Sequence, residues 1–396
     1  MAVRGGEPDA RDMLRNRPRA ARPRRLVLVL VAAAAVFALQ SGSALAWVLA
    51  SSHTPARVVA TRPDAAAPAA GGSAHVATAL PTQGIFDSCA LSSSLSTCEQ
   101  DLLQIHQAGM QVAVLSVQGD SLAQISAYAA YAQSIGMSVM WEINDPGFWG
   151  GAWIGASAAA DWSQFSQACG CTATSQILSY MIGWLSALPA TYGYYAADDS
   201  TLNPGQVAGL TQYVDAIKAA DPRHMVMVGS NEGQGTTYYP TGATIGNEIY
   251  PETTTSLLPY GPNIAMWQAI QQGVAQDAHA AARAGTGSAF ILQAFTFGDN
   301  IWDGEATGVC TASMSQAQCA SLLLYPSAGV QLELRNQVLA YAHPQLILWY
   351  TFSEASQGSR WAGLSSVVQA PYPVGAQAAR AGHSHRAAAL LRGRGR

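Results

Sequence analysis

Short runs rich in β-branched and aromatic residues alternate with longer amphipathic segments through the middle of this 396-residue chain. Most runs are continuously apolar, which is typical of strands that are buried on both faces. Amphipathic segments between such strands predict helical crossovers, and crossovers join parallel strands. The runs that we interpret as strands are residues 84–86, 111–117, 138–143, 192–197, 224–229, 244–249, 289–295 and 346–350.

The intervening segments predict helices over residues 94–109, 121–136, 175–188, 203–220, 264–284 and 326–342. Ser121 and Asn203-Pro204 are typical helix starts, and Gly109 and Gly136 are typical stops. Eight strands in about 290 residues fit a (β/α)8 TIM barrel better than an open doubly wound sheet. The stretch 230–243 is too short for a good helix, so we expect one outer helix to be missing. No G-x-G-x-x-G follows the first strand, which disfavours a dinucleotide-binding fold.

Residues 26–50 form an apolar segment without charged side chains that is long enough to span a bilayer. Eight arginines precede it, and a basic cytoplasmic flank predicts that the chain after residue 50 lies outside. Two outcomes stay open. Ala44-Leu45-Ala46 has the form of a signal-peptidase site, whereas the apolar run to Ala50 favours an uncleaved anchor. We therefore predict either a membrane-anchored protein with an extracellular domain or a secreted protein.

Composition divides the chain into five regions. The first is a basic cytoplasmic N-region over 1–25, followed by the transmembrane or signal segment 26–50. A flexible linker over 51–80, rich in Ala, Pro, Thr and Gly, leads to the barrel domain 81–368 and a disordered basic tail, 369–396. The arginines of the tail have no aromatic residues interleaved among them, so we expect no nucleic-acid binding.

The charge of the barrel domain differs from that of the whole chain. Residues 81–368 contain five lysines and arginines and twenty acidic residues, a formal charge of −15, whereas the whole chain carries −4. This charge disfavours phosphate-rich ligands and suits neutral or cationic substrates.

The six cysteines fall into three close pairs, at positions 89/98, 169/171 and 310/319. An even number of locally spaced cysteines in an exported chain predicts three disulfides. Cys169-Gly170-Cys171 has an alternative as a redox or metal pair, although an isolated pair without nearby histidines rarely holds zinc.

The predicted strand ends carry the polar chemistry of the domain. Active sites of (β/α)8 barrels lie at the C-terminal ends of the strands, and here carboxylates, amides and aromatic residues collect there while lysine and arginine do not. Carboxylates perform acid–base chemistry, amides bind hydroxyl groups and aromatic faces stack on pyranose rings. This composition predicts a site for sugars.

Three short motifs resemble those of barrel glycoside hydrolases. They are Gly193-Tyr-Tyr-Ala-Ala-Asp-Asp199, Glu248-Ile-Tyr-Pro251 and Leu292-Gln-Ala-Phe295. The resemblance implies a glycosidase-like barrel that acts on polysaccharide or oligosaccharide, with Asp199 as nucleophile on strand four and Glu248 as acid/base on strand six. Asp198 is the alternative to Asp199, because adjacent residues of a strand point to opposite faces; both aspartates have a further alternative as helix-capping residues. Gln293 on strand seven distinguishes this chain from the barrel glycosidases that have Glu on both strands four and seven.

Seven residues at or near the strand ends are assigned to substrate binding. Glu142 lies beside Trp141 on strand three, and Tyr250 either orients a sugar or packs against the barrel. The full set is Asp87, Trp141, Glu142, Tyr250, Gln293, Tyr350 and Glu354.

Other reaction classes fit poorly. A metal-dependent hydrolase needs histidines at strand ends, and the chain has neither H-x-H nor H-E-x-x-H, so we expect no metal or other cofactor. A serine hydrolase lacks its G-x-S-x-G sequence. The main alternative is a catalytically inactive barrel that binds glycans or a protein partner at the cell surface.

Overall fold

The computed structural model describes residues 81–143, 162–198, 204–230, 242–250, 264–297, 310–311 and 313–372. All of these residues belong to the second of the two units into which the chain divides, Met1–Ala74 and His75–Arg396. The predicted segment 26–50 and the linker that follows it lie outside the described residues. Among the helices that are described, none is long and apolar enough to cross a membrane.

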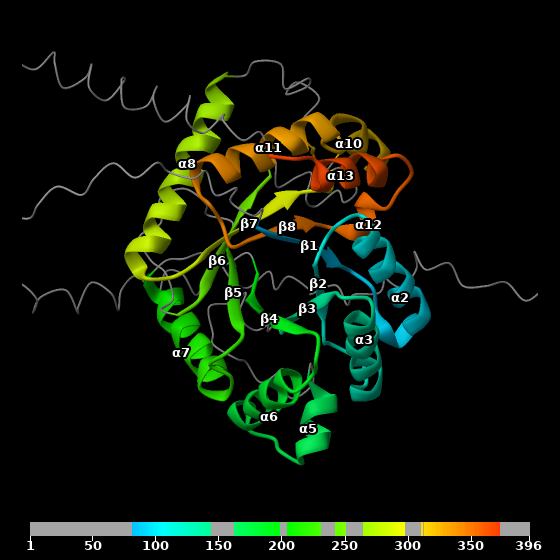
Figure 1. The fold of residues 1–396 in the computed structure, drawn as a ribbon, viewed down its shortest axis with the longest axis vertical. Helices are drawn as coiled ribbons and strands as arrows, with labels where there is room; N and C mark the ends of the chain where they lie inside the picture. The colour runs from blue at the N-terminus through cyan, green and yellow to red at the C-terminus, as the bar shows by residue number, and fades with distance from the viewer. Residues whose placement is uncertain are drawn as a thin grey trace, which may run out of the picture. The chain divides into compact units, whose positions relative to one another are not determined.

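Eight parallel strands close into a barrel in sequence order, with β8 pairing with β1, as the sequence predicted (Figure 1). The strands are β1 Thr82–Asp87, β2 Val112–Ser116, β3 Ser138–Glu142, β4 Thr191–Ala197, β5 Met225–Ser230, β6 Thr244–Ile249, β7 Ser288–Gln293 and β8 Leu346–Tyr350. The fold is therefore a (β/α)8 TIM barrel.

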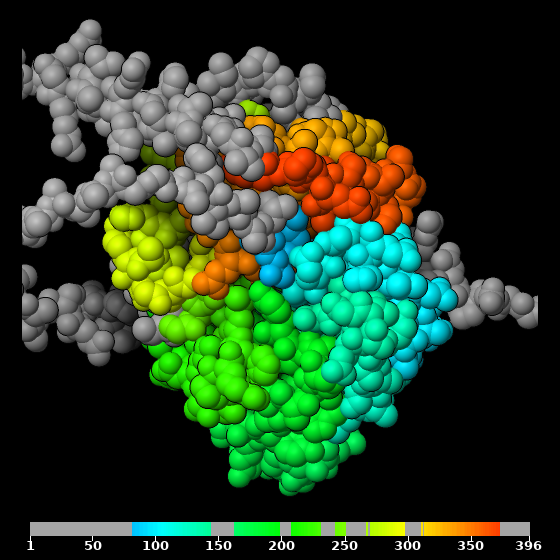
Figure 2. Space-filling model, viewed as in Figure 1, coloured from blue at the N-terminus to red at the C-terminus, as the bar shows by residue number. Residues whose placement is uncertain are grey.

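Helices surround the strands, and their side chains pack beside one another around the barrel (Figures 1 and 2). They are α2 Leu91–Gln107, α3 Leu122–Ser134, α5 Ser163–Cys169, α6 Thr174–Ser186, α7 Pro204–Ala220, α8 Ile264–Ala284, α10 Gln316–Leu322, α11 Ala328–Tyr341, α12 Phe352–Ala355 and α13 Arg360–Gln369. All six predicted helices are present, whereas α5, α10, α12 and α13 were not predicted. Most of the stretch 230–243 lies outside the described residues.

The ends of α3 show why the sequence folds locally as it does. The Ser121 hydroxyl accepts from the backbone N–H of Gln124, and the Gln124 side chain accepts from the Ser121 N–H, which forms a capping box. Gly136 follows the helix with φ of +79°, a left-handed conformation that suits glycine at a helix end.

Two apolar cores explain why the strands read as continuous apolar runs. Inside the barrel lie Val114, Met140, Met227, Ile291 and Leu348, among others. A larger core fills the space between the strands and the helices and includes the alternate residues of the same strands. Because both faces of each strand are buried, both carry apolar side chains.

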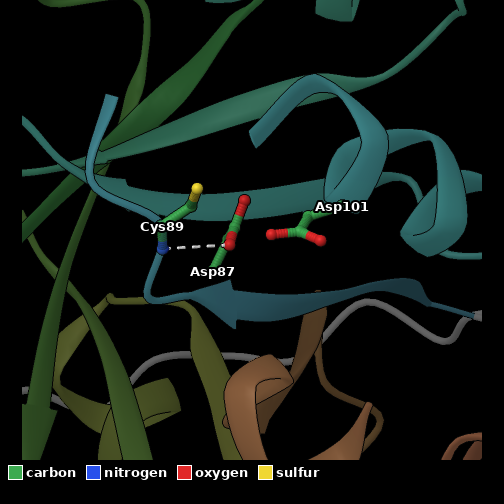
Figure 3. Close-up of side chains that lie close together, drawn as sticks. All are labelled: Asp87, Cys89 and Asp101. Atoms are coloured by element: carbon green, nitrogen blue, oxygen red, sulfur yellow. Dashed lines mark hydrogen bonds between the residues drawn. The ribbon is translucent and has the colours of Figure 1, made fainter. Parts of the chain in front are cut away.

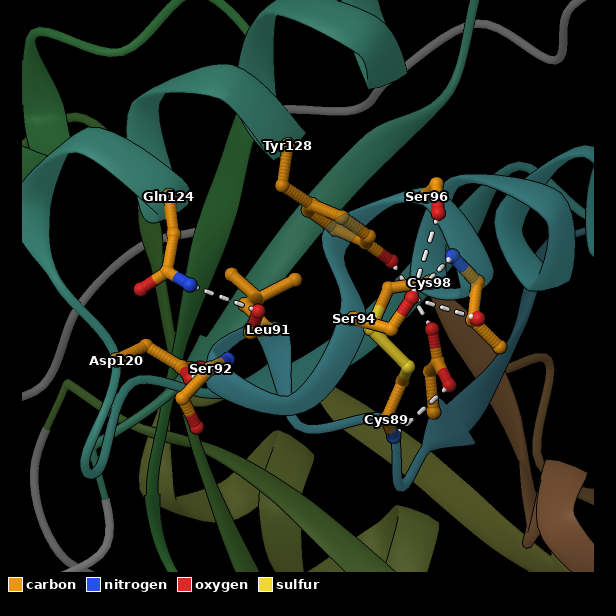
Figure 4. The surroundings of a disulfide bond; sticks show 11 residues. Cys89, Leu91, Ser92, Ser94, Ser96, Cys98, Asp120, Gln124 and Tyr128 are labelled. Atoms are coloured by element: carbon orange, nitrogen blue, oxygen red, sulfur yellow. Dashed lines mark hydrogen bonds between the residues drawn. A yellow bond between two sulfur atoms is a disulfide. The ribbon is translucent and has the colours of Figure 1, made fainter. Parts of the chain in front are cut away.

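Three disulfides are present, and they pair Cys89 with Cys98, Cys169 with Cys171 and Cys310 with Cys319. The predicted pairing is confirmed. In the second pair the two sulfur atoms are bonded to each other, so the alternative of a thiolate metal site does not apply. The first bridge fixes the turn after β1 to α2 (Figure 4).

Buried Arg335 holds the C-terminal end of α13 against the barrel. Its guanidinium donates to the carbonyls of Val367 and Val368, and its Nη2 donates to the carbonyl of Ala370 over 2.9 Å. A cation stabilises the unpaired carbonyls at a helix end. Helix α13 ends at Gln369.

A polar cluster lies before β5, centred on Asp221, which is 2% exposed. Its carboxylate accepts from the Tyr194 hydroxyl over 2.7 Å, from the backbone N–H of Arg223 over 3.0 Å, and pairs with Nδ1 of His224. Burial raises the pKa of Asp221, but the hydrogen bonds from His224, Tyr194 and Arg223 outweigh burial and lower this pKa to about 2.

We expect Asp221→Asn to lower the free energy of unfolding by about 2 kcal/mol at pH 7, the value of a pKa depressed by almost two units. Since the folded pKa is below the unfolded one, this contribution is present above pH 4 and is lost as the pH falls toward 2. Urea unfolding of both proteins at several pH values measures it. Asp215→Asn, at an exposed position of α7, is the control. Equal stability of Asp221→Asn and wild type at pH 7 would contradict this account.

Candidate active site

Alternation along the strands decides which side chains point into the barrel mouth at the C-terminal strand ends. On β3, Met140 belongs to the inner core while Val139 and Trp141 belong to the outer one, so Glu142 points inward. The same alternation places Glu248 on β6, Gln293 on β7 and Tyr350 on β8 inward. The structure thus gathers polar and aromatic side chains at one end of the barrel.

A cavity of about 240 Å³ lies at this end. The side chains around it come from the ends of β1, β2, β3, β4 and β8. Four of the described lining residues are acidic and none is basic. The lining consists of Phe86, Asp87, Ser88, Cys89, Ala90, Ser116, Gln118, Asp120, Glu142, Asp198 and Tyr350.

The Tyr195 hydroxyl lies near the carboxylates of Asp198 and Glu248, which belong to the strand-four and strand-six motifs. This hydroxyl lies inside the barrel and donates to the Asp198 carboxylate. Burial, followed by the negative charges of Asp198 and Glu248, raises the pKa of this hydroxyl well above its usual value. Tyr195 therefore stays a neutral donor that orients Asp198.

Gly229 on β5 provides the space for this arrangement. An added Cβ at position 229 would overlap the Tyr195 hydroxyl and lie 3.2 Å from Oε1 of Glu248. The absence of a side chain at this inward position lets the tyrosine and the glutamate approach each other.

Glu142 lies on the third strand around the same cavity. Burial, and secondly the charge of Asp198, raises the pKa of Glu142 to about 7. Its carboxyl group therefore exchanges its proton near neutral pH, which is the property of a group that handles protons or cations.

Aromatic rings border the cavity on the β8 side. Tyr350 is 37% exposed, and its ring centre lies 5.2 Å from that of Phe86 and 5.6 Å from that of Phe295. Tyr250 contacts Phe295 edge to face at 4.9 Å. An exposed aromatic ring beside carboxylates is suited to contact with the apolar face of a sugar.

Asp87, at the end of β1, is buried against α2 and α3 (Figure 3). It accepts hydrogen bonds from the Cys89 N–H and the Tyr128 hydroxyl, each with a length of 3.1 Å. Burial, followed by the charge of Asp101, raises the pKa of Asp87 to about 7. Asp87, Cys89 and Asp101 offer ligand atoms within 4.8 Å of one another. Because the Cys89 sulfur is disulfide-bonded, it is not a thiolate, and these residues do not form a complete metal site.

Of the predicted site residues, Asp87, Glu142, Asp198 and Tyr350 line the cavity. Glu248 lies beside Tyr195, and Tyr250 belongs to the aromatic border. Asp199 lies outside the described residues.

Three other predicted residues have partners away from the cavity. Trp141 points outward, fully buried, and its Nε1 donates to the Thr191 hydroxyl over 2.9 Å. Glu354 accepts from the backbone N–H of Thr296 over 2.7 Å and lies 3.9 Å from Arg360.

Gln293 is buried, and its Nε2 donates to the carbonyl of Phe295 over 3.2 Å. None of Trp141, Glu354 and Gln293 is among the residues that line the cavity.

Sequence reasoning did not single out several residues of the site. Tyr195 is part of the strand-four motif, and Ser116 and Gln118 stand at the end of strand two, where alternation would have marked them. Asp120 could not be predicted from strand alternation, because it lies beyond the end of β2. Its carboxylate accepts a 2.7 Å hydrogen bond from the Ser92 N–H at the start of α2 (Figure 4).

Comparison with known proteins finds similarity at the level of the fold. No protein-family model matches the chain, and no curated protein matches it by sequence. Among solved structures, an endo-β-1,4-mannanase from Thermotoga petrophila is 9% identical, with 73% of this chain and 76% of that chain covered and a TM-score of 0.43. An endo-1,4-β-mannanase from Rhizomucor miehei is 12% identical, with 73% and 94% covered and a TM-score of 0.43. A β-D-glucuronidase from Dictyoglomus thermophilum is 10% identical, with 74% and 51% covered and a TM-score of 0.42.

All three similarities have TM-scores below 0.5. At this level of identity they describe the fold alone. The site residues of the present chain therefore rest on its own geometry.

Proposed function

We propose that this protein hydrolyses glycosidic bonds, with Asp198 and Glu248 as its two catalytic carboxyl groups. The observation that carries the proposal is that both carboxylates lie around the Tyr195 hydroxyl at the C-terminal end of the barrel. Glycoside hydrolysis uses two carboxyl groups that flank the scissile bond, one of which donates a proton to the leaving oxygen. Of the two aspartates in the strand-four motif, Asp198 and Asp199, we assign the catalytic role to Asp198.

The roles follow from the surroundings of each group. Tyr195 orients the Asp198 carboxylate toward the reacting carbon, so Asp198 is the nucleophile. Glu248, from β6, is the acid that protonates the leaving oxygen and then activates water. The exposed Tyr350 ring supports one sugar unit beside them.

The place of action is outside the cytoplasm. Three disulfides support this placement, because such bonds persist in oxidising compartments. The leader sequence 26–50 would deliver the barrel there, either anchored or released.

The direct test is the release of reducing ends from a panel of polysaccharides and oligosaccharides by the full-length chain. We expect hydrolysis of at least one glycan by the wild type and by the exposed control Asp215→Asn. The isosteric variants Asp198→Asn and Glu248→Gln should each lose about 10²- to 10⁴-fold in rate. Activity that persists in both variants would contradict the assignment of the site.

The second candidate function is a catalytically inactive barrel that binds glycans. The amide of Gln293 at the inward end of β7, where one group of barrel glycosidases has a carboxylate, favours it. Binding of a glycan by wild type, with no hydrolysis of any glycan in the panel, would support this candidate instead.

A further inference from the structure

The lysines and arginines of the barrel lie outside the cavity, although Arg360 approaches the same end of the barrel, where it lies 3.9 Å from Glu354. Every lysine and arginine of residues 81–368 is described by the structure, and none lines the cavity. Lys218 donates to the carbonyl of His224 before β5, and Arg223 lies beside it at Asp221. Arg283 is exposed at the end of α8. Arg335 is buried at α13, and Arg360 lies over the Tyr325 ring.

Five segments that follow strands β3 to β7 fall outside the described residues, and in sequence they too are acidic and lack basic residues. Residues 144–161, 199–203, 231–241, 251–263 and 298–309 contain eight acidic residues and no lysine, arginine or histidine. Such a charge distribution repels uronic acids and sulfated or phosphorylated sugars and attracts cations.

Glu142 differs from the other acidic residues of the cavity. Asp87 accepts hydrogen bonds from Cys89 and Tyr128, and Asp120 accepts one from Ser92. Within the described part of the chain, no hydrogen-bond donor or cation contacts the side chain of Glu142, although it is partly buried at the cavity. A partly buried carboxylate that lacks a protein donor is suited to accept hydrogen bonds from a ligand.

We propose that the substrate is a glycan of amino sugars with free, protonated amino groups, and that the Glu142 carboxylate binds one ammonium group. The proposal rests on the proposed function, since it names the substrate class of the same site. An ammonium group has three donors and no acceptor, which complements a carboxylate that has acceptors only. Proximity of an ammonium group would also favour ionisation of Glu142 beside Asp198.

The test compares pairs of oligosaccharides that differ only in the acetyl group. Oligomers of glucosamine and of galactosamine, and their N-acetylated counterparts of equal length, are titrated into the full-length chain by calorimetry in the presence of EDTA. We expect at least one deacetylated oligomer to bind roughly tenfold to a hundredfold more tightly than its acetylated partner. This preference should weaken as salt is added.

Variants assign the preference to Glu142. Glu142→Gln keeps the size of the side chain and should bind both members of a pair with equal affinity. Glu142→Asp should retain part of the preference, and Asp215→Asn should retain all of it. Equal binding of both members by wild type, binding of neither, a requirement for a divalent cation, or an unchanged preference in Glu142→Gln would overturn the proposal.

The binding test of the substrate class and the hydrolysis test of the catalytic assignment can fail independently of each other. Preferential binding of amino-sugar oligomers without hydrolysis would support the ligand class and overturn the catalytic assignment. Hydrolysis of a neutral glycan with no preference for amino groups would support the catalytic assignment and overturn the proposed ligand class.

Discussion

Glu248→Gln should lower the hydrolysis of an unactivated oligosaccharide about a thousandfold, yet leave most of the activity toward a dinitrophenyl glycoside of the same sugar. The reason is that a dinitrophenolate leaves without protonation, whereas a sugar hydroxyl needs the proton that the proposed mechanism assigns to Glu248. Comparison of kcat/KM for the two substrate types measures the role. Equal losses for both would show that Glu248 is not the acid.

Loss of Asp198, the proposed nucleophile at the end of β4, should affect the two substrate types equally. Asp198→Gly should lose activity toward both substrate types, and added azide should restore it in part by forming a glycosyl azide at the vacated position. Glu354→Gln is a matched control, because Glu354 contacts Thr296 and Arg360 rather than the cavity. Failure of azide to restore activity, together with an inverted product, would assign the reaction to a direct attack by water.

Asp87→Asn should stabilise the protein relative to wild type by about 4 kcal/mol at pH 8 but by only about 1 kcal/mol at pH 4.5. The folded pKa of Asp87 is raised from 3.8 to about 7, mainly by burial and secondly by Asp101. The folded state therefore keeps a proton that the unfolded state releases, and stability falls as the pH rises from 4 to 7. Asparagine has no charge to desolvate, and its carbonyl still accepts from the Cys89 N–H.

Urea unfolding of the two proteins at both pH values measures this effect. The wild type should also lose some stability through Glu142, whose pKa is raised to about 7 as well, so only the difference between wild type and variant reports on Asp87. A variant that is less stable than wild type at pH 8 would mean that the Tyr128 hydrogen bond outweighs the cost of burying the charge.

The barrel was predictable because its strands are buried on both faces and so stand out as apolar runs. Strands β6 and β8 have the predicted bounds. Helix α13 was not predicted, since it is short and its end is held by Arg335, more than thirty residues away in the sequence. A contact over that distance leaves no local signal.

The side chains of Asp87, Glu142, Asp198 and Tyr350 line the cavity as residues of predicted strand ends, and physical reasons explain why others do not. Trp141 and Glu142 are neighbours on one strand and cannot both point inward, so alternation alone decides against the tryptophan. On β4 the side chain of Tyr195 points into the barrel. Strict alternation of side chains would therefore point Asp199, rather than Asp198, toward the cavity. A register shift between Tyr195 and Ala197 changes the alternation there and brings Asp198 to the cavity. Such a shift is not visible in the sequence.

Gly229 carries no functional group, yet the site depends on it as much as on the carboxylates. Any side chain at this position would displace the Tyr195 hydroxyl from Asp198 and crowd Glu248. The proposed hydrolysis therefore predicts that chains with the same activity keep glycine at position 229, even though no reacting atom belongs to it. In related chains, loss of this glycine would identify barrels that have kept the fold after abandoning the chemistry.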